Sequence, residues 1–141
     1  MYYINREQLE QLLEFLPVIS EACEQLKDNW NGTLLDGLAQ ERILHLAIES
    51  VTDVGSLLID AFMMRDASSY EDIVEILLGE NVLDREIGEP LIELVKLRKP
   101  LVQEYMKLDR DGLHPLIGDL PAILKKFAPS VRQFVRKELG E

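Results

Sequence analysis

Apolar residues recur at helical spacing along nearly the whole chain, and no stretch alternates apolar and polar residues as a strand would. Intervals of three and four residues place side chains on one face of a helix. Turn-forming residues separate five such segments, near positions 5–27, 36–65, 68–79, 84–108 and 114–139, the last with a second possible start at Asp119. We therefore predict an all-α fold, an antiparallel bundle of four to five main helices.

The chain has 141 residues, which is enough to bury a core without disulfides or metals. We expect a single domain over residues 1–141, because we find neither an internal repeat nor a low-complexity linker. Cys23 is the only cysteine and is expected to be a small buried apolar residue. The sequence has no apolar run of about 20 residues and no secretory signal at its start, so we expect a cytoplasmic protein without a membrane span.

Charge is distributed unevenly over the predicted helices. The net charge of −11 argues against nonspecific binding to polyanions, although a local nucleic-acid site remains compatible with it. The outer face of the first helix is rich in glutamate, whereas Lys125, Arg132 and Arg136 share one side of the last helix. These cations either pair with the first helix, which is the simpler use, or form a strip that binds RNA.

A polar line runs along the predicted second helix and contains Arg42, His45, Glu49, Asp53, Ser56 and Asp60. Side chains at this spacing can contact one another, and the simplest interpretation is an exposed face with internal ion pairs. Di-metal sites in helical bundles use Glu-x-x-His on two helices, whereas Glu41 and His45 are four residues apart and have no second copy. We therefore expect no metal and no cofactor. Trp30, in the turn before this helix, either packs on the bundle or lies at an interface.

The segment Arg98–Tyr105, RKPLVQEY, places Arg98 and Tyr105 on an apolar stripe about two helical turns apart. Arg98 either extends from the edge of the core to water, or lines a site together with Gln103 and Tyr105. Pro100 either kinks the helix or begins a new helical segment. A break between Arg98 and Gln103 could direct both side chains into one pocket.

This segment resembles the signature of the HepT-like branch of the HEPN proteins, in which an arginine is followed by four residues, a histidine, any residue and a tyrosine. The resemblance extends through SYEDIVEILLGENVLDRE and ERILHLAIESVTDVGSLLIDAFMMRD, covers most of residues 38–110, and fits the YutE type within this branch. It implies a HEPN-like helical bundle, a two-fold homodimer and metal-independent cleavage of RNA.

The resemblance also implies roles for individual residues. Arg98 would stabilise charge on the phosphate, and Tyr105 matches the tyrosine to which a partner nucleotidyltransferase, the antitoxin, adds AMP. Gln103 stands where the family has its catalytic histidine, and an amide cannot exchange a proton at biological pH. Lys99 likewise replaces the frequent asparagine.

We therefore predict a toxin-type ribonuclease whose cleavage is weak or lost. The alternatives are a non-catalytic dimeric module that binds RNA or protein, and a bundle in which Arg98 only ties helices together and Tyr105 only packs.

Overall fold

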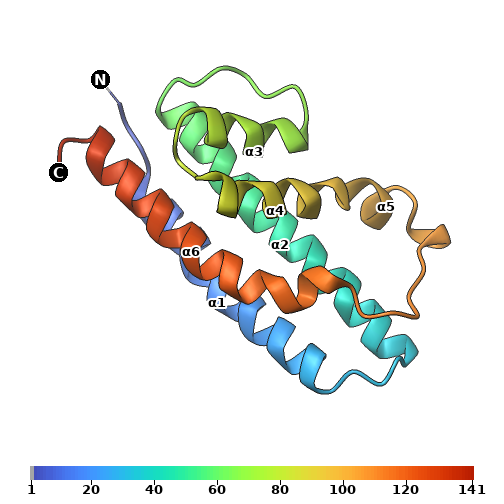
Figure 1. The fold of residues 1–141 in the computed structure, drawn as a ribbon. Helices are drawn as coiled ribbons and strands as arrows, with labels where there is room; N and C mark the ends of the chain where they lie inside the picture. The colour runs from blue at the N-terminus through green and yellow to red at the C-terminus, as the bar shows by residue number, and fades with distance from the viewer. Residues whose placement is uncertain (1) are drawn as a thin grey trace.

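The computed structural model describes residues 2–141, and within them it contains helices and no strand. The helices are α1 (Arg6–Asp28), α2 (Leu34–Ala61), α3 (Tyr70–Gly79), α4 (Arg85–Lys96), α5 (Arg98–Val102) and α6 (Pro115–Glu138), with a 3-10 helix η1 (Tyr105–Lys107). Five of them are long, and they pack as an antiparallel bundle (Figure 1), which confirms the predicted fold class. No helix among these residues is long and apolar enough to cross a membrane.

Helices α1 and α6 run antiparallel along one side of the bundle and bring the two ends of the chain together (Figure 1). The Asn5 side chain caps α1 by accepting a hydrogen bond from the Gln8 amide, and the helix lies within the predicted segment 5–27 apart from its last residue. Helix α6 begins at Pro115 and is capped by His114, whose Nδ1 accepts from the Leu116 amide. The alternative start at Asp119 is wrong, because a proline at the first helical position loses no hydrogen bond.

Helix α2 is the central element, and it contacts α1, α3, α4 and α5. It begins at Leu34 because Thr33 and Asp36 form a capping box, so the predicted start at Asp36 or Gly37 is about one turn late. It ends at Ala61, earlier than predicted. Because α2 is covered on several sides, its buried residues form more than the single predicted stripe, and they include Leu44, Ile48 and Ile59.

Helices α3 and α4 form a hairpin that lies across α2 (Figure 1). Ser69 and Asp84 cap these helices, close to the predicted starts near 68 and 84. Gly55 of α2 allows α3 to approach, since a Cβ there would lie 2.3 Å from Ile73 Cγ2. The absence of a side chain at Gly55 therefore permits the close packing of α3 on α2.

The predicted helix over 84–108 is broken, and the break lies at Leu97, between α4 and α5. Pro100 has no N–H to donate to the Lys96 carbonyl. The Leu97 amide turns back to Leu94, and the α-helical pattern resumes when the Leu101 amide donates to Leu97 O at 3.0 Å. A new segment does form, but it begins at Arg98 and already ends at Val102.

Trp30, which the sequence left open, and Cys23, which was expected to be buried, both lie in or against the core. Trp30 packs on the bundle, partly buried against the main hydrophobic cluster. Cys23 is fully buried, and this burial raises the pKa of its thiol to about 11, as expected for an unreactive packing residue.

Candidate functional site: a buried-edge arginine on the broken helix

Arg98, the first residue of α5, directs its side chain toward α2 and α3. Its Nε lies 3.6 Å from Glu49 Oε1, and only 24% of the side chain is exposed. Nε is buried and has no hydrogen-bond partner within residues 2–141. The guanidinium thus lies in an ion pair that leaves its hydrogen-bonding capacity partly unused.

Tyr70, the first residue of α3, provides an aromatic surface for this guanidinium. Arg98 Cζ lies 3.7 Å from the centroid of the Tyr70 ring, a close cation–π contact. Stacking fixes the plane of the guanidinium, which a lysine ammonium would not allow. The sequence analysis did not select Tyr70, and only its place at the start of SYEDIVEILLGENVLDRE marked it.

Glu49 belongs to the polar line of α2, which the sequence predicted to be an exposed face with internal ion pairs. The structure differs there, because Glu49 also contacts Arg98 of α5. Glu49 Oε1 contacts Arg98 Nε and also lies 3.3 Å from His45 Nε2. His45 Nδ1 lies 3.5 Å from Arg42 Nη1. Burial, and secondarily the charge of Glu49, raises the pKa of Asp53 above its ordinary range. The middle of the polar line therefore forms part of the Arg98 site.

Gln103 does not approach Arg98 through the broken helix. Its backbone closes the C-terminus of α5, with its amide donating to Lys99 O at 2.8 Å, and its side chain is exposed. The break precedes both residues instead of separating them, so the predicted convergence of Arg98 and Gln103 in one pocket does not occur within this chain. Neither Gln103 nor Tyr105 makes a side-chain hydrogen bond or ion pair in the described part of the chain.

Tyr105 lies in the 3-10 helix η1, with 53% of its surface exposed. The sequence predicted one continuous stripe that carries both Arg98 and Tyr105. That prediction is wrong, because α5 ends at Val102, between the two residues. The Tyr105 carbonyl accepts a hydrogen bond from Arg110, whose guanidinium also pairs with Glu41 of α2. The Gln40 amide side chain adds bonds to Gly112 O and the His114 amide. These contacts fasten the segment between α5 and α6 to the start of α2.

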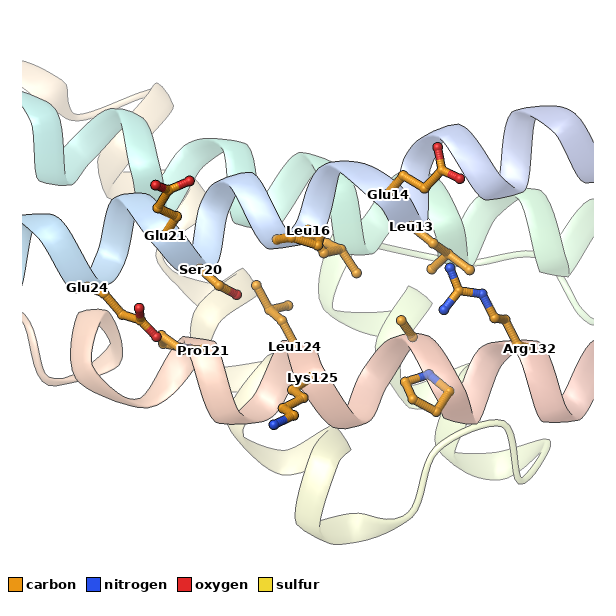
Figure 2. Close-up of a pocket in the computed structure, with 13 residues that line it drawn as sticks. Leu13, Glu14, Leu16, Ser20, Glu21, Glu24, Pro121, Leu124, Lys125 and Arg132 are labelled. Atoms are coloured by element: carbon orange, nitrogen blue, oxygen red, sulfur yellow. The ribbon is translucent and has the colours of Figure 1, made fainter.

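The basic side of α6 faces a groove of about 570 Å³ between α1 and α6 (Figure 2). Arg132 reaches across this groove and holds Glu10 through two hydrogen bonds of 3.1 and 3.0 Å. These bonds lower the pKa of Glu10. Lys125 lines the same groove as the glutamates of α1 at positions 14, 21 and 24. Pairing with the first helix is therefore confirmed for Arg132, and the acidic wall of the groove disfavours an RNA-binding strip there.

Metal ligation has no obvious place in this site. Among residues 2–141 no three His, Cys, Asp or Glu side chains are grouped as metal ligands would be. The chemistry that remains available at Arg98 is electrostatic, with proton transfer from neighbouring side chains.

The chain is therefore a helical-bundle protein, all-α and antiparallel, with an arginine at the start of a broken helix. The family model of the HepT-like ribonucleases matches residues 6–136. The chain belongs to the HepT-like ribonuclease family.

Individual relatives agree with this assignment. The chain is 36% identical over 140 residues to the candidate RNase YutE of Bacillus subtilis, covering 99% of this chain and 96% of YutE. A candidate RNase of Archaeoglobus fulgidus is 26% identical over 129 residues, covering 91% of this chain and 96% of that protein.

Two solved structures have the same fold. The structure of the cytosolic protein YutE from Bacillus subtilis, of unknown function, matches with a TM-score of 0.85 and 34% identity, covering 100% of this chain and 97% of that one. A crystal structure of a toxin–antitoxin complex with AMP-PNP matches with a TM-score of 0.74 and 13% identity, covering 87% of this chain and 96% of that one. At this identity the match shows a shared fold only.

Proposed function

We propose that this protein is a metal-independent RNA endonuclease of the toxin type, with Arg98 as the phosphate-binding group and slow cleavage because Gln103 replaces the motif histidine. Family membership and the relatives described as candidate RNases support the activity. The observation that carries the role of Arg98 is its guanidinium, stacked on Tyr70 with Nε unbonded.

The chemistry at Arg98 follows from its surroundings. A guanidinium forks onto phosphate oxygens, and charge stabilisation is strongest in a site partly shielded from water. Glu49 neutralises Arg98 in the free protein at a distance of 3.6 Å, which is too long for a hydrogen bond. A phosphate could therefore replace water at the guanidinium without breaking a strong internal bond.

Gln103 sets the limit on the rate. Removing a general acid or base costs about 10²–10⁴-fold, and an amide can only orient its neighbours. The Gln103 side chain is exposed, so a second protomer could complete the site around it.

We propose that the working form is a two-fold homodimer with the segment Arg98–Tyr105 in or beside its interface. Residues 1–141 would form one domain in each protomer. The exposed apolar side chain of Met106, directly after this segment, supports that position. Cytoplasmic localisation belongs to the same proposal.

Tyr105 is proposed as the residue that a partner nucleotidyltransferase modifies with AMP. Its exposure and its fixed place in η1 leave the hydroxyl accessible to a second enzyme. The added phosphate would place negative charge beside the motif and block RNA. Intact mass after co-expression with the nucleotidyltransferase should increase by one adenylyl group, and the increase should be absent in Tyr105→Phe. An unshifted mass would leave Tyr105 without this role.

The test of the activity uses a labelled single-stranded RNA in the presence of EDTA. Wild type should cleave it slowly, and Arg98→Ala should abolish cleavage while melting at a similar temperature. If wild type binds the RNA and Arg98→Ala weakens binding with no cleavage in either, the protein is a binding module and not a nuclease.

A further inference from the structure

We infer that His45 is a catalytic residue of this site and makes one of the two proton transfers, taking the proton of the attacking ribose 2′-hydroxyl. This inference rests on the proposed function, because it assigns a further group to the same cleavage reaction. His45 lies outside the Arg98–Tyr105 segment, on α2, and nothing in its spacing along the chain places it near Arg98. The fold brings the two together through Glu49.

One carboxylate oxygen joins the imidazole and the guanidinium. Glu49 Oε1 lies 3.3 Å from His45 Nε2 and 3.6 Å from Arg98 Nε. The side chain of His45 is 32% exposed, so a ligand on Arg98 can reach it. A phosphate held by Arg98 would have the imidazole as its neighbour on the α2 side.

The partners of the ring assign its tautomer. A carboxylate at Nε2 favours the N–H on that atom, which leaves the Nδ1 lone pair as the base. Nδ1 faces Arg42 Nη1 at 3.5 Å, the outer limit of a hydrogen bond, and Arg42 is free to turn toward a phosphate. Binding of RNA would thereby release Nδ1.

The charges around His45 suit an anionic substrate. Arg42 and Glu49 on α2 and Arg98 on α5 carry two positive charges and one negative charge. Asp53, one turn further along α2, adds a second carboxylate, and its pKa is raised. Helix α1 contributes only uncharged side chains, Gln8, Gln11, Leu12 and Phe15, to the groove beside Glu49, so the charges of the site nearly balance in an otherwise acidic protein.

The proposed step is a transesterification within the RNA. Nδ1 of His45 takes the proton of a ribose 2′-hydroxyl, and the 2′-oxygen forms a bond to the adjacent phosphorus. The bond from phosphorus to the 5′-oxygen breaks, and water protonates that oxygen as it leaves. The products are a 2′,3′-cyclic phosphate and a 5′-hydroxyl, and no metal or oxidant takes part.

The other histidine is occupied elsewhere. His114 caps α6 through Nδ1, and burial lowers its pKa. His114→Asn removes the imidazole and retains a good N-cap residue, so it is a matched control for His45→Gln. Glutamine at position 45 keeps a donor for Glu49 and a high helix propensity.

The experiment measures cleavage of a labelled single-stranded RNA in EDTA across neutral pH, for wild type, His45→Gln, His114→Asn and Gln103→His. We expect His45→Gln to lower the wild-type rate by about 10²-fold or more and His114→Asn to leave it unchanged. The wild-type rate should rise with pH, because the neutral imidazole is the base, and His45→Gln should lose this dependence.

Other outcomes separate the inference from the proposed function. Equal rates and pH profiles in wild type and His45→Gln would overturn the role of His45 and leave the ribonuclease proposal intact. If wild type is inert and Gln103→His is active, the role of His45 also fails, whereas the ribonuclease proposal stands. If wild type and Gln103→His are both inert, the ribonuclease proposal and the role of His45 both fail.

Discussion

At the scale of single residues, Arg98 differs from an arginine that only ties helices together. Such an arginine uses its donors on carboxylates or carbonyls, as Arg132 does with Glu10 through two hydrogen bonds. Arg98 instead lies flat on Tyr70 and leaves Nε unbonded beside Glu49. Nε itself is buried, but 24% of the Arg98 side chain is exposed, and a fixed, partly shielded cation is suited to a ligand phosphate.

A second residue, Asp72, should control how stability depends on pH. Arg65 holds its carboxylate through hydrogen bonds of 2.6 and 2.8 Å, and the pKa of Asp72 lies well below its usual range. Because the folded pKa is depressed, this contribution is complete above the ordinary aspartate pKa of about 3.9 and is lost as the pH falls toward the folded value.

Urea unfolding at several pH values measures this effect. Asp72→Asn should be less stable than wild type at pH 6, and the difference should shrink as the pH falls below about 4. Asp66→Asn, in the loop before α3 and with no partner for its side chain in the described chain, should differ little from wild type at any pH. A deficit of Asp72→Asn that does not change with pH would contradict the linkage.

At the scale of helices, the packing of α3 on α2 depends on Gly55. Gly55→Ala places a Cβ 2.3 Å from Ile73 Cγ2. Overpacking of this kind costs about 1–3 kcal/mol, whereas alanine gains at most about 1 kcal/mol of helix propensity, so we expect net destabilisation. Gly79→Ala is the control, because a Cβ there meets nothing within 4 Å. Thermal melts should move in opposite directions, and a stabilised Gly55→Ala would contradict the close approach.

Helix signals that are local were readable from the sequence. Helices capped by Asn5, Ser69 and Asp84 begin within about two residues of the starts predicted near 5, 68 and 84, because a cap acts within four residues. The break at Leu97 was displaced from its expected place because Pro100 removes a bond to Lys96, so its effect falls upstream. The early end of α5, which separates Tyr105 from Arg98, has no comparable local signal.

Only part of the site could be predicted from the sequence, because its contacts join residues that are far apart along the chain. Arg98 was identified by its place on an apolar stripe and by family resemblance. Its contact with Glu49 joins positions 49 residues apart in the sequence. Spacing within α2 predicted a polar line, but it could not say which helix would cover that line or that Tyr70 would lie against Arg98.

At the scale of the whole molecule, the proposed dimer places the exposed apolar residues of η1 at or near an interface. Met106 is 83% exposed, and a glutamate there should weaken association. Met63, 79% exposed just beyond the other end of α2, provides a control with matched exposure. Light scattering at micromolar concentration should give a dimer for wild type and Met63→Glu and a monomer for Met106→Glu. A monomeric wild type would exclude the proposed dimer.

Cleavage of RNA in EDTA by wild type, Gln103→His, and each of these with Arg98→Ala tests the central claim most directly. The claim is that the site binds phosphate through Arg98 and lacks one proton-transfer group. We predict that Gln103→His raises the rate by about 10²-fold or more and that Arg98→Ala abolishes cleavage in both backgrounds. Equal rates in wild type and Gln103→His, or cleavage that survives Arg98→Ala, would contradict the account.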